Sequence, residues 1–279
     1  MAGKLYLCAT PIGNLEDITL RVLETLKSVD IIAAEDTRHT LKLLNHYGIK
    51  AKLTSYHEHN KYDKAAALVQ DLLSGKNIAL VTDAGTPAIS DPGEELAKAA
   101  FEAGIEVTSL PGASALVVAL SMSPLSSRRF VFEGFLPSEK KERREVLESL
   151  REETRTIVLY EAPHRLKKTL KELEEVLGDR KLNLCRELTK IHEDILISTI
   201  SELLVYFEAN EPRGEMVLII EGKDKEELKE ERISSWEEMS IEEHVRFYTD
   251  QGFEEKEAMK IAAKDRGISK RDIYEELKK

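Results

Sequence analysis

The segment VTDAGTPAISDPG, residues 81–93, holds two aspartates, two glycines and two prolines directly after an apolar run. Ligands of open parallel sheets bind at the carboxyl ends of the strands, so a loop of this kind is a candidate site. Phosphate groups prefer main-chain amides and cations, and this loop has no lysine or arginine. We therefore expect it to bind a ligand with a cationic group through Asp83. Asp91 is assigned to the start of the next helix.

The segment AEDTRHT, residues 34–40, follows the apolar run IIAA and gathers titratable side chains. A carboxylate at a strand end can take a proton from a substrate hydroxyl, which makes Glu35 and Asp36 candidate bases. The same residues also suit a helix start, with Asp36 or Thr37 as the N-cap. Both roles remain open, and they are compatible.

The segment SYHEHN, residues 55–60, places His57 and His59 two positions apart. Such a pair needs further Cys or His ligands to complete a zinc site, and none is clustered with it. We therefore expect no metal, and we assign His57 to proton acceptance or substrate contact.

Four further loops lie beside expected strands, at residues 9–14, 110–115, 160–165 and 211–216. None matches the dinucleotide fingerprint or the Walker phosphate loop. Gly13 allows a close backbone approach to a ligand, although small residues in these loops also suit simple packing.

The elements that carry these loops alternate between strand and helix patterns. Residues 1–115 predict an α/β domain with a parallel sheet covered by helices on both faces. Residues 116–222 predict a second α/β domain, in which the last strands have connections short enough for antiparallel members. The expected fold class is α/β, with two domains of mostly parallel sheets and a small helical tail.

Residues 223–279 are expected to form a charged linker and that tail. Nine of the ten residues in 223–232 are charged, which is typical of a linker or a solvated helix. The later helices, with a turn at Gly267 and a cap at Ser269, suit a helix-turn-helix or a small bundle without a nucleic-acid role.

The composition favours a soluble globular protein, because 42% of the 279 residues are hydrophobic and 33% are charged. No apolar run reaches the roughly 18 residues of a membrane span, and we expect no signal peptide. Cys8 and Cys185 lie in apolar runs, so we expect buried free thiols and a cytoplasmic location.

The net charge of −11 argues against a protein that coats nucleic acid. Two local stretches are basic, with six basic and three acidic residues in 128–144, and six and two in 256–271. They suit phosphate contacts or, alternatively, solvated helix faces.

The loops together resemble one family. The order ATPIGNL, EDTR, YHEHN, DAGTPAISDPG, PGASA, EGFLP, YEAPHR, RELTKIHE, GEMVLIIEG is similar to that of the bacterial 16S ribosomal RNA (cytidine-2′-O)-methyltransferases. These are a branch of the tetrapyrrole methylase-like (class III) methyltransferases. The resemblance covers about residues 4–222 and continues more loosely into the tail. Corrin-type relatives usually carry Gly-Asp-Pro where this chain has Asp83, Ala84 and Gly85.

The resemblance implies S-adenosylmethionine in a cleft between the two α/β domains, a homodimer, and methyl transfer to a cytidine ribose 2′-hydroxyl in 16S rRNA of the small ribosomal subunit. Carried over by position, the cofactor contacts are Ile12, Gly13, Asp83, Gly85, Thr86, Ser114, Ala115, Tyr160, Gly214, Glu215 and Met216.

Transfer of this kind needs alignment, exclusion of water and removal of the hydroxyl proton. The candidate catalytic residues are Glu35, Asp36 and His57 as bases, with Arg38 orienting the substrate or a phosphate. On this hypothesis Asp36→Asn keeps cofactor binding and loses most transfer.

The RNA is expected to meet basic side chains, with the C-terminal helices as a second surface and an affinity that falls steeply with salt. The expected phosphate contacts are Arg128, Arg129, Lys140, Lys141, Arg143 and Arg144.

Two alternatives remain open. The same fold can methylate a tetrapyrrole or a protein side chain, which the acidic net charge favours and the missing Gly-Asp-Pro disfavours. A non-catalytic RNA-binding assembly factor that keeps the fold is the other alternative.

Overall fold

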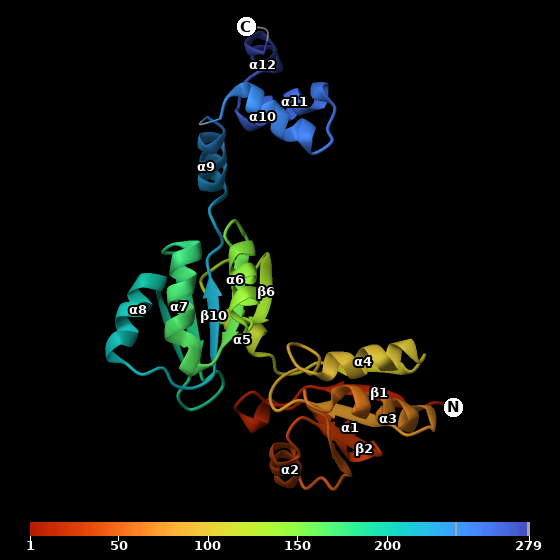
Figure 1. The fold of residues 1–279 in the computed structure, drawn as a ribbon. Helices are drawn as coiled ribbons and strands as arrows, with labels where there is room; N and C mark the ends of the chain where they lie inside the picture. Colours follow the sequence, from red (N-terminus) through yellow and green to blue (C-terminus); the bar gives the residue numbers. More distant parts are fainter. Residues whose placement is uncertain (238, 278–279) are drawn as a thin grey trace. The chain divides into compact units, whose positions relative to one another are not determined.

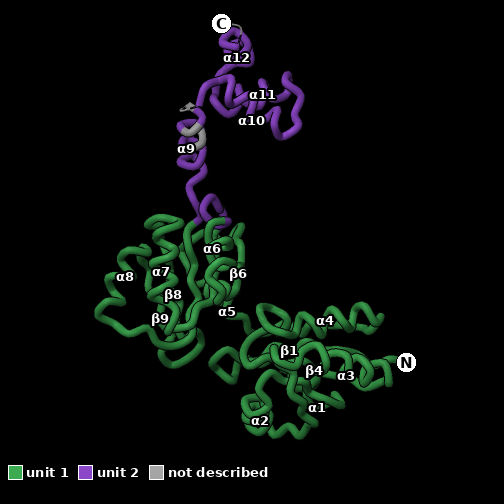
Figure 2. Tube along the Cα trace, in the orientation of Figure 1, with its two compact units in different colours: residues 1–148, 156–221 green, residues 149–155, 222–279 purple. Residues whose placement is uncertain are grey.

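The computed structural model describes residues 1–237 and 239–277. The chain forms two compact units (Figure 2). The first unit holds both sheets, and its residues are Met1–Glu148 and Thr156–Glu221. The second is helical and consists of Ser149–Arg155 and Gly222–Lys279. The division of the first unit into domains at residue 115 stays a prediction.

The first sheet has five parallel strands in the order β3-β2-β4-β1-β5. Their bounds are β1 Lys4–Cys8, β2 Ile31–Ala34, β3 Leu53–Ser55, β4 Ile78–Val81 and β5 Glu106–Leu110. β2 and β4 are buried at every position because helices cover both faces of the sheet.

One face of this sheet packs with α3 (Lys61–Leu73) and α4 (Gly93–Glu102) through Leu68, Leu72 and Leu96. The other face packs with α1 (Leu20–Ser28) and α2 (Thr37–His46) through Leu26 and Leu44 (Figure 1). A short 3-10 helix, Leu15–Asp17, follows the first loop.

The second sheet has the order β6-β7-β10-β8-β9. Its strands are β6 Phe130–Phe135, β7 Thr156–Glu161, β8 Lys181–Arg186, β9 Asp194–Thr199 and β10 Met216–Ile220. Its helices are α5 Ala115–Met122, α6 Lys140–Ser149, α7 Pro163–Leu177 and α8 Ile200–Ala209.

The predicted fold class is confirmed, with one correction in this second sheet. Only β6 and β7 pair in parallel, and the other three pairs are antiparallel. β8 and β9 are joined by residues 187–193, which is too short for the dozen or more residues of a parallel crossover. Because β10 runs antiparallel to β7, it begins beside the end of β7, where Met216 pairs with Glu161.

The helical unit contains α9 (Lys225–Glu237), α10 (Ile241–Asp250), α11 (Glu255–Asp265) and α12 (Lys270–Glu276). Val245, Met259 and Ile273 lie in its core. Capping boxes begin α10 at Ser240 and α12 at Ser269, as the sequence predicted for Ser269. In the charged stretch 223–232, the helix begins at residue 225.

The structure tests the predictions for the cysteines and for membrane spans. Cys8 and Cys185 are free and buried, as predicted. Burial raises the pKa of Cys8 to about 12, and burial with the nearby Glu193 raises that of Cys185 to about 11. In the described part of the chain, every helix is too short or too polar to span a membrane.

Candidate functional site

The loops after β1 and β4 form one wall of the site. These strands are neighbours at the point where the strand order reverses, which is where open α/β sheets form a crevice. The main chains of Thr10 and Gly85 exchange two hydrogen bonds of 2.9 and 3.0 Å. The hydroxyl of Thr10 donates a third bond, of 3.0 Å, to the carbonyl of Thr82. The two loops are therefore joined as one element.

The loop of residues 82–92 is held by its own side chains. Gly85 adopts a φ of 87°, a conformation that side chains disfavour. The hydroxyl of Thr86 donates to the carbonyl of Ala113 over 3.1 Å. Oδ1 of Asp91 accepts from the amides of Ala88 and Gly93, at 3.0 and 2.7 Å, so it organises the helix start as the sequence indicated.

Non-glycine residues with positive φ occur in two loops of the site. Ala88 and Ser90 lie in the loop after β4, and Glu187 and Thr189 lie in the loop after β8. Each such conformation costs about 1–3 kcal/mol, and it persists only where the surrounding structure holds it. The hydrogen bonds of Asp91 support these conformations in the loop after β4.

The second wall comes from the other sheet. Its lining residues include Phe135 at the end of β6, Tyr160 on β7 and Met216 at the start of β10. The ring of Tyr160 contacts that of Phe135 edge-on, with centroids 5.6 Å apart. The amide of Leu116 donates to the Tyr160 hydroxyl over 3.1 Å, and burial raises the pKa of this tyrosine.

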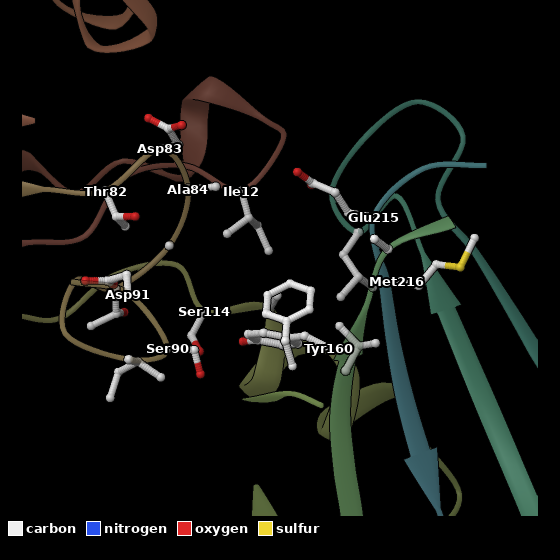
Figure 3. A pocket seen from close by; sticks show the side chains of 18 of the residues that line it. Ile12, Thr82, Asp83, Ala84, Ser90, Asp91, Ser114, Tyr160, Glu215 and Met216 are labelled. Carbon is white, nitrogen blue, oxygen red and sulfur yellow. The ribbon is translucent and has the colours of Figure 1, made fainter. Parts of the chain in front are cut away.

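A cavity of about 430 Å³ lies between these walls. Figure 3 shows Thr82, Asp83 and Asp91 on one side, and Tyr160, Glu215 and Met216 on the other. Most predicted cofactor contacts line it, namely Ile12, Asp83, Gly85, Thr86, Ser114, Ala115, Tyr160, Glu215 and Met216. Other residues of the lining carry no sequence signal and were not predicted, among them Ala84, Ser90, Phe135, Ala162, Leu188 and Val217.

Five carboxylates line this cavity, from Glu35, Asp83, Asp91, Glu161 and Glu215. None of its lining residues, within the part of the chain that the structure describes, is lysine, arginine or histidine. An anionic ligand would meet no cationic side chain in this lining, whereas a cationic ligand would be stabilised by the carboxylates.

Gly13 and Gly214 do not line this cavity. A Cβ on Gly13 would lie 2.5 Å from Cγ of Lys190 and 2.6 Å from Oγ1 of Thr189. The close approach expected at Gly13 is therefore to the protein's own loop after β8. The amide of Asn14 donates to Oγ1 of Thr189 over 3.0 Å, which joins this loop to the first wall.

Of the predicted catalytic residues, Glu35 lines the cavity and accepts a 2.7 Å hydrogen bond from the Thr82 hydroxyl. Asp36 is the N-cap of α2 and forms an ion pair of 2.7 Å with Arg38. The side-chain hydrogen bond from Arg38 lowers the pKa of Asp36 far below its usual range. Neither Asp36 nor Arg38 is among the residues that line this cavity.

His57 follows β3, which is the edge strand and is separated from β4 by β2. Its amide donates to Oδ1 of Asn60 over 2.8 Å, and the residue lies outside this cavity. Across residues 1–237 and 239–277, no three His, Cys, Asp or Glu side chains are grouped as a metal site would require.

The predicted phosphate contacts do not form one surface. The prediction for Arg143 is wrong, because its side chain is only 3% exposed and cannot contact a phosphate. Arg128 and Arg129 precede β6, whereas Phe135 at its other end lines the cavity. A strand of six residues spans roughly 20 Å, so these arginines lie at the end of β6 that is farther from the cavity. Lys140 and Lys141 are exposed at the start of α6.

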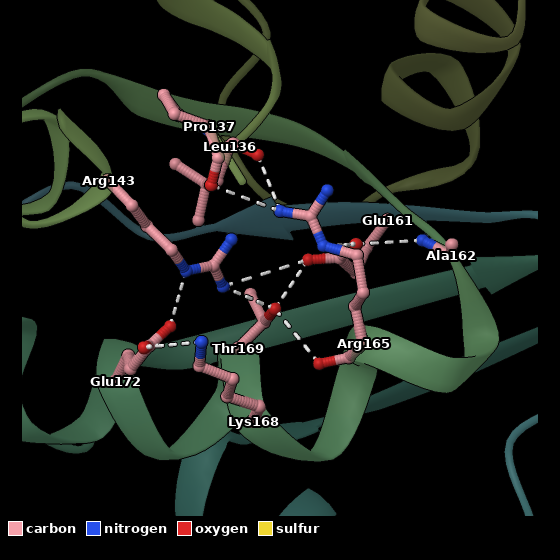
Figure 4. A network of polar contacts seen from close by, with 9 residues as sticks. All are labelled: Leu136, Pro137, Arg143, Glu161, Ala162, Arg165, Lys168, Thr169 and Glu172. Carbon is pink, nitrogen blue, oxygen red and sulfur yellow. Dashed lines mark hydrogen bonds and ion pairs between the residues drawn. The ribbon is translucent and has the colours of Figure 1, made fainter. Parts of the chain in front are cut away.

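Arg143 instead belongs to a buried polar network behind the second wall (Figure 4). Its Nε donates to Glu172 over 2.5 Å and its Nη2 donates to Thr169 over 2.7 Å. Thr169 donates in turn to Glu161, whose carboxylate also pairs with Nε of Arg165 at 3.3 Å. The charge that Glu161 brings to the cavity is thus largely compensated from behind.

A second cavity, of about 470 Å³, adjoins the first. Ile12, Thr82, Asp83, Ala84 and Glu215 line both. Its other lining residues include Gly13 and three cationic or titratable nitrogen side chains, those of His39, Lys42 and Lys190.

Comparisons with known proteins agree with this architecture. The family model of the tetrapyrrole (corrin/porphyrin) methylases matches residues 4–204. The ribosomal RNA small subunit methyltransferase I of Halalkalibacterium halodurans is 51% identical over 272 residues, which are 98% of this chain and 93% of that protein. The protein of the same name from Bacillus subtilis is 50% identical over 273 residues, again 98% and 93%.

Among solved structures, a uroporphyrin-III C-methyltransferase from Thermus thermophilus complexed with S-adenosyl homocysteine aligns with a TM-score of 0.57. The alignment covers 78% of this chain and 97% of that chain at 18% identity, so the likeness concerns the fold. The resemblance found in the loop motifs is confirmed by the family model and by the relatives that are about half identical.

Proposed function

The chain belongs to the tetrapyrrole (corrin/porphyrin) methylase family, and we propose that it transfers a methyl group from S-adenosylmethionine to a cytidine ribose 2′-hydroxyl in 16S rRNA. The observation that carries this proposal is the first cavity, which is lined by five carboxylates and by no cation of the described chain. The relatives named ribosomal RNA small subunit methyltransferase I support RNA as the acceptor.

The lining residues fit this cofactor. The volume of about 430 Å³ lies in the usual range for small-molecule sites, roughly 300–1,000 Å³. S-adenosylmethionine carries a positive sulfonium and a positive ammonium, which carboxylates and aromatic faces both stabilise. When bound, the cofactor supplies an electrophilic methyl group whose sulfur leaves as a neutral thioether.

The protein's part is to align the reactants and to exclude water. Ile12, Leu188 and Met216 provide the apolar lining, and Phe135 with Tyr160 provides the aromatic wall. Glu35 stays in the proposal as a cavity residue that holds the Thr82 hydroxyl. Asp36, Arg38 and His57 line neither this cavity nor the one that adjoins it, so the proposal does not use them as bases.

The location follows from the free cysteines, and the ribosomal substrate and the oligomeric state follow from the family resemblance. We place the reaction in the cytoplasm, on the small ribosomal subunit, and we expect the chain to act as a homodimer. Light scattering during size-exclusion chromatography measures the mass directly, and a monomer at micromolar concentration would contradict the dimer.

The function is tested by incubation with radiolabelled S-adenosylmethionine and 30S subunits from a strain that lacks this modification. We expect label on 16S rRNA, and nuclease protection with mapping should place it on one cytidine ribose. Large subunits serve as the control and should remain unlabelled. Label on a protein or on a small molecule, with none on RNA, would overturn the proposal.

A further inference from the structure

The second cavity shares part of its lining with the first. Ile12, Thr82, Asp83, Ala84 and Glu215 line both cavities. A group held in the second cavity therefore lies directly beside a group held in the first. A methyl acceptor must meet this condition, because the reacting atoms must approach to about 3–3.5 Å.

The two cavities differ in charge. No lysine, arginine or histidine among the described residues lines the first, whereas His39, Lys42 and Lys190 line the second. His39 and Lys42 are exposed on α2, three positions apart and so on one face of the helix. Within the part of the chain that the structure describes, neither forms an ion pair. They remain available for an anionic ligand.

Lys190 has a different role. Its ammonium group donates to Glu187 over 3.1 Å and to Glu215 over 3.0 Å. Burial alone would lower its pKa, but the bonds to these carboxylates outweigh burial and the pKa is raised. Lys190 therefore fixes Glu215 at the boundary between the cavities, and α2 supplies the free positive charge.

We propose that the second cavity holds the acceptor nucleotide of an RNA strand, with His39 and Lys42 meeting its flanking phosphates and Asp83 taking the hydroxyl proton. Phosphates suit lysine and histidine side chains at a cavity mouth, and a ribose has the hydroxyl that the reaction needs. This inference rests on the proposed function and adds the position of the acceptor.

Asp83 is the carboxylate placed to take the proton. It lines both cavities, and its Oδ1 accepts a 3.0 Å hydrogen bond from the amide of Asp36. Its Oδ2 has no hydrogen bond from any residue in 1–237 or 239–277. Glu215 also borders both cavities, but it is paired with Lys190.

The step balances with these groups. The hydroxyl oxygen forms its bond to the methyl carbon while the carbon–sulfur bond breaks, and the electron pair of that bond stays on sulfur. The hydroxyl proton passes to the carboxylate of Asp83. No oxidant, reductant or metal is required.

The acceptor site is tested with Lys42→Glu in the chain of 279 residues. We expect the KM for 30S subunits to rise about tenfold or more, while the Kd for S-adenosylmethionine, measured by calorimetry, stays within twofold. Lys98→Glu makes the same charge change on α4, where the residue is exposed and lines neither cavity, and it should leave both values unchanged.

An unchanged KM in Lys42→Glu, with normal methylation of RNA by the wild type, would overturn the inference and leave the proposed function intact. Absence of RNA methylation by the wild type would overturn both.

The role of Asp83 is tested with Asp83→Asn under single-turnover conditions. We expect the transfer rate to fall by about 10²–10⁴ while the subunits still bind with wild-type affinity. Glu35→Gln is the comparison, because Glu35 lines only the first cavity and should change the cofactor Kd more than the transfer rate. A transfer rate in Asp83→Asn within threefold of the wild type would remove Asp83 from the proposal.

Discussion

The main-chain amide of Asp36 donates a hydrogen bond of 3.0 Å to the side chain of Asp83. This bond joins the loop after β2 to the loop after β4 and fixes one oxygen of the Asp83 carboxylate. Because the donor is a backbone group, it survives any substitution of the Asp36 side chain except proline. The two acidic residues therefore have separable roles.

We predict that Asp36→Asn retains turnover within about threefold of the wild type. Asparagine caps a helix as well as aspartate does, and the lost ion pair is to an exposed arginine. Initial rates with 30S subunits measure this, with Asp83→Asn as the comparison. A loss of a hundredfold in Asp36→Asn would restore the base role that the sequence alone suggested.

Tyr160 should contribute to cofactor affinity through its ring and its hydroxyl. We predict that Tyr160→Ala weakens S-adenosylmethionine binding about tenfold, since the aromatic wall beside Phe135 is lost. Tyr160→Phe keeps the ring but leaves the Leu116 amide without its acceptor, so it should mainly lower the melting temperature. Calorimetry and thermal unfolding separate the two effects, and the exposed Tyr62→Phe is the control. Equal cofactor affinity in wild type and Tyr160→Ala would contradict this role.

Arg143 and Arg144 are neighbours on α6 with opposite environments. We predict that Arg143→Met lowers the free energy of unfolding by about 3–5 kcal/mol, because Glu161 and Glu172 lose a buried partner. Arg144→Met, where the side chain is 51% exposed, should change it by less than about 1 kcal/mol. Urea unfolding measures both. Similar values for the two variants would show that the network adds little stability.

The exposed basic residues beside β6 and α6 should contribute unequally to the salt dependence of RNA binding. Replacement of Lys140 and Lys141 by alanine should reduce the slope of log affinity against log salt by about 0.7–0.9 for each lost phosphate contact. The same double replacement at Arg128 and Arg129 should change the slope less, because these residues lie at the opposite end of β6 from the cavity. Binding to 30S subunits at several salt concentrations measures this. Equal slopes in both double variants would argue for a wider RNA footprint.

The sequence predicted the fold class and most of the first cavity because the relevant signals are local. Buried runs such as IIAA and IALV indicate strands of a parallel sheet, and the loops that follow them must meet at one edge. Asp83 and Thr86 are therefore placed correctly once the strands are recognised. The antiparallel direction of β10 could not be predicted, because an apolar run such as MVLII does not indicate the direction of its strand.

Other features depend on contacts that no local pattern contains. His57 follows a strand like the other site residues, but β3 lies at the edge of the sheet, and strand order is not evident from periodicity. Arg143 shares a helix face with the buried Leu147, but its carboxylate partners on β7 and α7 are evident only from the structure. The second cavity needs α2 and the loop after β8 together, which are more than a hundred residues apart.

The helical unit combines two separate segments of the sequence, which limits where the chain can be truncated. Besides the C-terminal helices, this unit includes Ser149–Arg155, a segment from the middle of the sequence. The amide of Lys223 donates to the carbonyl of Glu153 over 2.7 Å, and a Cβ on Gly222 would clash with the main chain of Thr154 and Arg155. Deleting everything after Glu221 would therefore remove these contacts from an internal loop. A screen for a minimal catalytic fragment should redesign that loop together with the cut, since both belong to one compact unit.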